Sequence, residues 1–397
     1  MLQSFKSKII FPQSLPNKDK FYWDIQEIEN SFSGRMDFDH IGIFIKEAGQ
    51  LLLNAISLFE KGYFDCAYYS LRSALDVATT LVYFVDMPEE ERNVKFSAWK
   101  ENDHFPMKGE MIQALLKRGN ILRDMKEKMP KFFDDAQKLS EKLNKYVHKQ
   151  GFQNYYVVRE HYFNSKPQDR FIQNFENNLK KCIGVIAVMR LAIDPFPVLL
   201  LDDEILCRCP GLLEEPYRED FVKEYIGEKY LEAYKTTEIY KGLYDYYMVQ
   251  ERKNEAVFNV IQYQIIDTSK KEEILSQIHL LGLDDIVCVT IAFACDKAVR
   301  LYPQELCELC VYYTDRKSNR INQKSYMKDS QRFSSNENKY NQPDDEVFIS
   351  VFPFRDINYF VEHNEKLTDS DIETISNELK SLDNTLPSIK NYMEEDL

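Results

Sequence analysis

Glycine is scarce in this chain: only 12 of the 397 residues are glycine, whereas 26 are phenylalanine and 25 are tyrosine. Nucleotide-binding folds hold phosphates in glycine-rich loops of fixed spacing, and the chain has neither a G-x-G-x-x-G nor a P-loop motif. An all-β fold with many tight turns would also need more glycine. The shortage therefore argues against both classes and favours a helical protein.

Long apolar runs are also missing. The longest, Cys182–Met189 and Ile286–Cys295, fall short of the roughly 20 apolar residues that a membrane-spanning helix needs. The first residues, MLQSFKSKIIFPQSLP, lack the apolar stretch of a secretory signal. We therefore expect a cytoplasmic protein with no membrane partner, in which the 8 cysteines remain mostly reduced.

Positive charge is in deficit, with 51 Lys and Arg against 65 Asp and Glu, so the net charge is -14. Such a chain offers no broad electrostatic footprint for nucleic acid. One stretch, residues 314–345, is locally basic and nearly free of aliphatic side chains. We expect a polar, mobile loop there, and the alternative is a segment that orders on an acidic partner or on nucleic acid. Its candidate nucleic-acid-binding residues are Arg316, Lys317, Arg320 and Lys324.

The length of the chain exceeds what one hydrophobic core usually serves, and an apolar content of 44% is enough for real cores. The prolines in Asp194-Pro195-Phe196-Pro197 stop helix formation, so we place a domain boundary there. The expected fold class is mainly α. It comprises an irregular N-terminal arm (1–38), a helical bundle (39–193) and a mostly helical C-terminal domain with a small β element (194–397).

The bundle is organised around Phe64–Val85, where apolar residues recur at i, i+3, i+4 and i+7 without an interrupting Gly or Pro. The Lys61-Gly62 pair before it ends the preceding helix, so these two helices should be antiparallel neighbours. The predicted helices of the bundle are Asp39–Glu60, Phe64–Val85, Gly109–Met129, Pro130–Gly151 and Asp169–Ile193.

The C-terminal domain has weaker patterns. Two apolar runs, Val198–Leu201 and Ile205–Cys209, have extended character, and Glu346–Phe354 alternates like a strand that pairs with Val311–Tyr313. The last helix is Asp369–Leu382. Patchy helical periodicity predicts further helices at Tyr217–Tyr234, Thr236–Arg252, Asn254–Ile266, Lys270–Leu281 and Asp284–Leu301.

Three polar residues of the bundle are the candidate catalytic residues. Arg72 and Asp76 stand at i, i+4 beside the apolar stripe of the central helix, and His148 lies near the end of a later helix. The simple interpretation is a surface salt bridge and a histidine that holds the last helical carbonyls. The alternative is that the two helices are neighbours, in which case Asp76 orients the imidazole and Arg72 binds an anion.

Cysteine pairs raise the question of a metal site. Cys207-x-Cys209 and Cys307-x-x-Cys310 together offer four thiols, but about 100 residues separate the pairs, whereas a zinc ribbon expects roughly 15–20. No βαβ pattern supports a thioredoxin-like use of Cys307 and Cys310, and no H-E-x-x-H or G-x-S-x-G motif occurs. We therefore expect neither a metal nor another cofactor.

Two segments carry a family resemblance. LRSALDVA (71–78) and, some 70 residues later, LNKYVHKQG (143–151) resemble HEPN-like helical domains over roughly residues 40–193. The nearest pattern is a bacterial branch with LR-x-x-[LI]-[ED] in its second helix and a [YF]-V-H-G-like turn after a later one. The resemblance implies a helical bundle in a bacterial defence or stress system. HEPN ribonucleases cut RNA, usually as dimers, with an Arg-x(4–6)-His motif that activates the 2′-hydroxyl.

The chain departs from that motif, because the arginine position before His148 falls on Leu143, Lys142 or Glu141. We therefore expect a helical interaction or scaffold protein with a HEPN-like module, which binds a protein partner or a second copy of itself. The alternative is a metal-independent, RNA-cleaving HEPN effector that uses His148 with Arg72. The ribonuclease predicts a basic cleft around His148, whereas the scaffold predicts a buried His148 and an exposed aromatic patch elsewhere.

Overall fold

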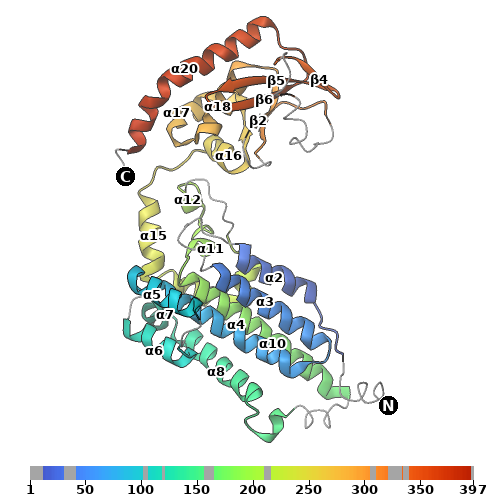
Figure 1. The fold of residues 1–397 in the computed structure, drawn as a ribbon, viewed down its shortest axis with the longest axis vertical. Coiled ribbons are helices and arrows are strands. Elements are labelled where there is room, and N and C mark those ends of the chain that lie inside the picture. The colour runs from blue at the N-terminus through green and yellow to red at the C-terminus, as the bar shows by residue number, and fades with distance from the viewer. Residues whose placement is uncertain are drawn as a thin grey trace. The chain divides into compact units, whose positions relative to one another are not determined.

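The structure is a computed structural model that describes residues 12–30, 42–101, 106–118, 121–155, 165–209, 216–304, 310–320, 333 and 339–394. Helices dominate these residues, and a mixed sheet lies near the C-terminus (Figure 1), which confirms the mainly helical fold with a small β element. The chain divides into two compact units, which we describe separately. The first comprises Met1–Leu206 and Leu212–Gln250, and the second comprises Cys207–Gly211 and Glu251–Leu397.

The first unit is a helical bundle whose long central helix, α4, has the predicted bounds. α4 buries Phe64, Leu71 and Leu75 along one face, and α3 packs against it along its length. Gly62, with φ of 84°, makes the tight turn between them, in a backbone region that a side chain would strain. The helices are α2 Lys18–Asn30, α3 Gly42–Glu60, α4 Phe64–Val85, α5 Glu89–Lys100, α6 Lys108–Arg118, α7 Ile121–Lys128, α8 Pro130–Val147, α10 Ser165–Leu191, α14 Glu228–Tyr234 and α15 Glu238–Met248.

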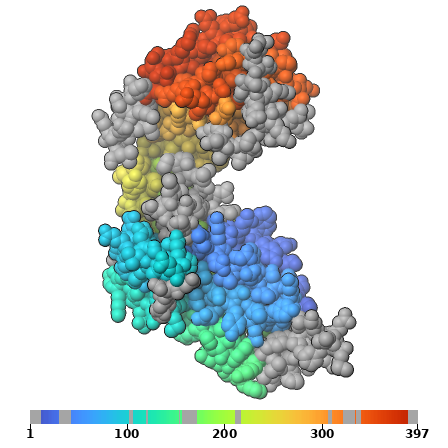
Figure 2. Space-filling view, in the orientation of Figure 1, coloured from blue at the N-terminus to red at the C-terminus, as the bar shows by residue number. Residues whose placement is uncertain are grey.

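By length and composition alone, one described helix, α3, is apolar enough to cross a membrane. The core helix of a soluble bundle passes the same test, and α3 buries Phe44, Leu52, Ile56 and Phe59 against its neighbours. Lys46 lies on the opposite face of α3 and is exposed. Residues in the blue of the N-terminal helices form part of the surface of the first unit (Figure 2). The apolarity of α3 is therefore accounted for by packing within the bundle.

The arm expected to be irregular contains helix α2, which charged side chains fasten to a later part of the first unit. Asp24 is fully buried and accepts hydrogen bonds from Lys20 Nζ at 2.6 Å, Arg218 Nη2 at 2.6 Å and the Tyr225 hydroxyl at 2.5 Å. Tyr225 belongs to a π-helix, η3 (Val222–Ile226), which follows the short helix α13 (Glu219–Phe221). Charge-assisted bonds to a buried carboxylate are strong, so α2 is an integral part of the bundle.

The prediction of extended runs after the proline pair was wrong. Val198–Leu201 lies at the end of α11 (Phe196–Leu199), and Ile205 belongs to α12 (Asp203–Leu206). Proline is tolerated in the first turn of a helix, where its missing N–H has no intrahelical partner, and Asp194 Oδ1 accepts the Phe196 N–H. The prolines therefore start a short helix, and the first unit continues beyond the predicted boundary to Gln250.

The second unit is built on a six-stranded mixed sheet with strand order β1-β3-β2-β6-β5-β4. Its strands are β1 Ile265–Ile266, β2 Ala298–Pro303, β3 Tyr312–Thr314, β4 Gln342–Asp344, β5 Val347–Phe354 and β6 Ile357–His363. Side chains from α16 (Glu255–Tyr263), α17 (Lys271–Ser276), α18 (Leu283–Ala294) and α20 (Asp369–Glu394) pack with sheet residues in one core. A smaller apolar cluster comprises Tyr302, Ile349 and Phe360 of the sheet together with Phe333.

Three expectations for the second unit need correction. The predicted helix at Asp284–Leu301 ends at Ala294 and gives way to β2, because an apolar run of this length suits either structure. β3 pairs with β1 and β2, whereas β5 pairs with β4 and β6, so the predicted pairing of Val311–Tyr313 with the strand at 346–354 is wrong. The predicted loop at 314–345 contains β4, and its residues 321–332 and 334–338 lie outside the described chain.

Candidate functional site

A row of polar residues joins α4 to α8, and we call it the polar seam. Asp65, Tyr69, Arg72 and Asp76 are spaced four, three and four residues apart, so they form one stripe along α4. Asp65 pairs with Lys149 at 2.5 Å, and the Tyr69 hydroxyl donates to the Val147 carbonyl at 3.0 Å. The seam therefore begins where α8 ends and follows α4 away from that end.

Arg72 is the centre of the polar seam. Its Nε donates to Asn144 Oδ1 at 2.7 Å, and its Nη1 lies 3.0 Å from Asp76 Oδ2. Lys108 Nζ lies 3.6 Å from the other Asp76 oxygen and donates to the Ser140 hydroxyl at 3.4 Å. Burial lowers the pKa of Lys108, although the Asp76 carboxylate offsets part of that effect. Asp76 is thus shared by two cations, and Arg72 acts as a brace between α4 and α8.

His148 caps α8 without joining this network. Its main-chain N–H donates to the Asn144 carbonyl at 2.8 Å, while the side chain is exposed. Within the described chain, the imidazole has no hydrogen-bond or ion-pair partner, so Asp76 does not hold it. The structure therefore brings Arg72 and Asp76 together, as the i, i+4 spacing indicated, and leaves His148 outside their contacts.

Exposed aromatic rings accompany His148. Phe152 is 75% exposed and Tyr155 is 45% exposed, with their ring centroids 6.2 Å apart, and Tyr69 of the polar seam is 47% exposed. We call these three residues, together with His148, the aromatic edge. The periodicity of the sequence did not reveal it, because Phe152 and Tyr155 follow Gly151, beyond the end of the helical pattern.

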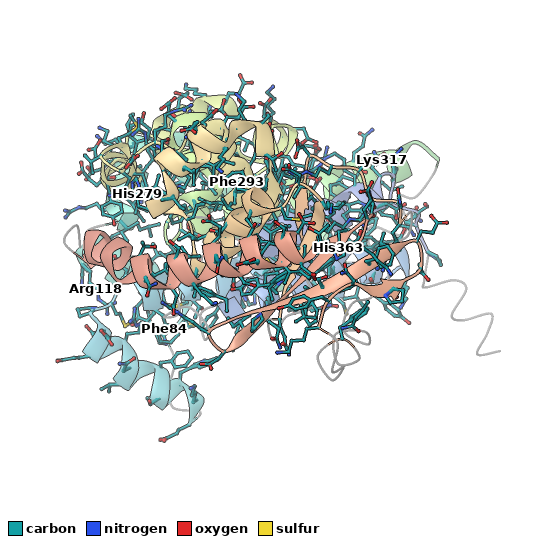
Figure 3. All side chains as sticks on the ribbon, turned by 90° about the horizontal axis from the view of Figure 1, so that it is seen from above. Phe84, Arg118, His279, Phe293, Lys317 and His363 are labelled. Carbon is teal, nitrogen blue, oxygen red and sulfur yellow. The ribbon has the colours of Figure 1, made fainter. Side chains whose placement is uncertain are left out.

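Most of the described candidate nucleic-acid-binding cations serve the interior of the second unit. Arg316 Nη1 donates to the carbonyls of Cys295 and Ala298 at 3.0 Å, so it caps the end of α18. Arg320 is buried and pairs with Asp344. Lys317 is exposed (Figure 3). Lys324 lies outside the described residues. Only Lys317 of the described three is therefore positioned as an accessible cation.

A fully buried carboxylate, Glu362 of β6, is the centre that explains why Arg320 turns inward. Glu362 accepts hydrogen bonds from the Tyr302 hydroxyl at 3.0 Å and the Ser318 hydroxyl at 2.6 Å. Arg300 Nη1 lies 3.5 Å from one oxygen, and Arg320 Nη1 lies 3.9 Å from the other. No sequence pattern indicated this cluster, because its members come from separate strands and a loop.

The described cysteines do not form a metal centre. Among the described residues, no group of three or more His, Cys, Asp or Glu side chains is arranged to hold a metal ion, and Cys307 lies outside them. Cys182 is fully buried, which raises its pKa to about 12 and keeps it a thiol. Cys207 and Cys209 belong to the second unit.

Comparison of the chain with protein-family models, with curated proteins and with solved structures finds no match. The likeness of residues 71–78 and 143–151 to HEPN-like domains therefore rests on the sequence patterns themselves.

Proposed function

We propose that this chain is a helical interaction or scaffold protein, and that the aromatic edge of the first unit is its binding surface. The observation that carries the proposal is the exposure of Phe152 and Tyr155, while Arg72 and Asp76 are occupied within the polar seam. Aromatic side chains are enriched at protein interfaces, where they bury much area at a small entropic cost. The partner is a protein or a second copy of this chain.

The polar seam supports this role by holding the edge in place. Tyr69 spans from α4 to the last carbonyls of α8, and the Asp65–Lys149 ion pair holds the residue after His148. A binding surface loses less entropy when its residues are already positioned. The scaffold was expected to have a buried His148 and an aromatic patch elsewhere, and this expectation was wrong, because His148 is exposed and the exposed Phe152 follows it by four residues. The HEPN-like segments favour a cytoplasmic setting in bacterial defence or stress response.

One observation favours the alternative, a metal-independent ribonuclease that uses His148 and Arg72. Asn144 contacts both residues, because its carbonyl accepts the His148 N–H and its side chain accepts the Arg72 Nε–H. Arg72 therefore lies about one helical turn from His148 along α8. An exposed imidazole is accessible to an RNA substrate. For this role, Arg72 would have to exchange Asp76 for a phosphate group.

Sedimentation velocity over a range of concentrations tests the interaction role. Replacing Phe152 and Tyr155 with serine should abolish a dimer that the wild type forms. Tyr246→Ser is the matched control, because Tyr246 is 54% exposed on α15 and lies outside the aromatic edge. The proposal fails if the wild type remains monomeric and a photo-crosslinking amino acid at position 155 captures no protein in cells.

Incubation with labelled single-stranded RNA and tRNA tests the alternative. If His148→Ala abolishes cleavage and His279→Ala does not, the ribonuclease replaces the interaction role as the leading function. His279 is a suitable control, because it is also exposed and instead pairs with Glu251 at 2.9 Å. An absence of cleavage by the wild type would eliminate the ribonuclease and leave the binding surface.

A further inference from the structure

One side of α8 carries a row of lysines, which we call the lysine face together with one lysine of α10: Lys131, Lys138, Lys142, Lys145 and Lys181. At about 100° per residue, the four α8 lysines point within about 60° of one another, and they span about 21 Å along the helix. All five are exposed except Lys142, which is partly buried. A chain with a net charge of -14 therefore presents a local row of positive charge on its first unit.

Lys142 is the fixed point of the lysine face. Its Nζ donates to Asn178 Oδ1 at 3.0 Å, and Asn178 of α10 is only 1% exposed. Lys181 follows Asn178 by three residues, so the two lie on the same side of α10. Lys145 follows Lys142 by three residues and lies beside it on α8. Lys142 is therefore held in place next to two other cations, one on each helix.

The lysine face has little negative charge to balance it. Lys138 pairs with Asp135 at 3.4 Å, and none of the other four lysines forms an ion pair with a carboxylate of the described residues. Partial burial, and then the charge of Lys181, lower the pKa of Lys142. A partly buried ammonium group beside like charges is unfavourable, so an anion bound next to Lys142 would stabilise the charged form.

Carboxylates beside the row indicate which kind of anion fits. Asp135 and Glu141 each lie about 60° from Lys138 around α8, one on either side of it, and both are exposed. A nucleic-acid backbone along the row would place its phosphates near these two negative charges. A polypeptide can instead set carboxylates against the lysines and neutral or basic side chains against Asp135 and Glu141. The charge pattern therefore favours an acidic polypeptide over nucleic acid.

The spacing of the row matches that of a second helix. Lys138, Lys142 and Lys145 are four and three residues apart, and acidic residues at the same intervals form one stripe on a helix. We propose that the lysine face docks an acidic helical segment of a partner protein, with one partner carboxylate bound between Lys142 and Lys181. The contact depends on cations and not on exposed rings, so it stands whether or not the aromatic edge binds a protein.

Fluorescence anisotropy tests the proposal with the full chain and two labelled, alanine-rich helical peptides. One peptide carries glutamate at alternating intervals of four and three residues, and the other carries glutamine at the same positions. We expect only the glutamate peptide to bind, and its binding to weaken as salt screens the charges. Equal binding of the two peptides, or no binding of either at low salt, would overturn the proposal. Tighter binding of labelled single-stranded RNA through the same lysines would assign the face to nucleic acid instead.

Variants locate the centre of the contact. Lys142→Gln and Lys181→Gln should each weaken binding of the glutamate peptide roughly tenfold, because each removes a charge-assisted hydrogen bond to the same carboxylate. Lys241→Gln is the matched control, because Lys241 is exposed on α15 and lies outside the lysine face. Lys181 is exposed, so its variant decides the matter if Lys142→Gln folds poorly. Equal affinities in Lys181→Gln and Lys241→Gln would overturn the proposal, and a wild-type dimer that Lys181→Gln abolishes would replace the partner by a second copy.

Discussion

The polar seam of the first unit and the Glu362 cluster of the second both use arginine as an internal brace, but they differ in how the partners are related along the chain. In the seam, Arg72 pairs with Asp76 one helical turn away and also donates to Asn144 of the neighbouring helix α8. In the cluster, Glu362 of β6 contacts groups from β2 and from the loop at 318–320. A local pair follows from helical spacing, whereas a non-local cluster exists only once the sheet has formed.

The largest effect should come from removing the charge at the centre of the cluster. Glu362→Gln keeps the shape of the side chain but removes the negative charge that faces Arg300 and Arg320. We expect this change to lower the free energy of unfolding by about 3–5 kcal/mol. Urea unfolding measures the loss in unfolding free energy, and hydrogen exchange of peptides from β6 shows whether the loss affects that strand. Glu373→Gln is the control, because Glu373 is exposed on α20. Equal losses in both variants would show that the buried charge has no special role.

A smaller effect should follow from a methyl group at Gly184 of α10, which tests whether the first unit also depends on a non-local contact. A Cβ there would lie 2.1 Å from the Tyr225 carbonyl oxygen, so α10 and the π-helix η3 would have to separate. We expect Gly184→Ala to lower the unfolding free energy by about 1–3 kcal/mol. Gly242→Ala, which meets open space on α15, should be neutral or stabilising. Thermal denaturation of both variants distinguishes these outcomes.

The polar seam should be weaker than the cluster. Arg72→Ala removes the bonds to Asn144 and Asp76, and since the Arg72 side chain is 31% exposed, we expect a loss of about 1 kcal/mol. Arg123→Ala is the matched control, because Arg123 is 57% exposed and its i, i+4 partner lies 3.9 Å away. A loss as large as that of Glu362→Gln, in the same denaturation assay, would erase the contrast between the two regions.

The smallest effect should come from a change of pH, which alters the stability of the second unit through the protonation of His363 (Figure 3). His363 is fully buried, its ring contacts the Ser350 hydroxyl at 2.9 Å, and burial lowers its pKa below the usual 6.5. The unfolded chain therefore binds this proton more readily, so stability is complete above pH 6.5 and falls as the pH drops below it. The groups around it are Lys297, Glu362, Glu365 and Asp371.

Urea midpoints at pH 7.5 and 5.5 measure this dependence. The His363→Gln variant should show a smaller difference between the two values than the wild type, because glutamine does not titrate. His279→Gln serves as the control, since His279 is exposed. A midpoint that does not change with pH in the wild type would mean that His363 binds its proton equally well in the folded and unfolded states.

The sequence was most informative where neighbours along a helix decide the structure. The apolar stripe predicted α4 with its observed ends, and the last helix, α20, begins at the predicted Asp369 but extends beyond the predicted Leu382 to Glu394. It was least informative for β2 and β6, since a short apolar run fits a strand or a buried helix equally well.

The candidate site shows the same division. The i, i+4 spacing correctly indicated the Arg72–Asp76 pair. It did not indicate that Asn144 and Lys108 occupy these side chains, because those contacts depend on how α6 and α8 pack on α4. The inward turn of Arg320 was equally out of reach, since its partners follow it by 24 and 42 positions in the sequence.

The π-helix at Val222–Ile226 has a consequence for how this chain tolerates genetic change. A π turn contains one residue more than an α turn, which is what the insertion of a single codon into a helix would add. Deleting one residue there would convert the π turn into an α turn and bring Arg218 and Tyr225 one residue closer along the chain. Both residues donate to Asp24, so the change in spacing would disturb this pair of hydrogen bonds. In this short segment, the number of residues is as constrained as the identity of their side chains.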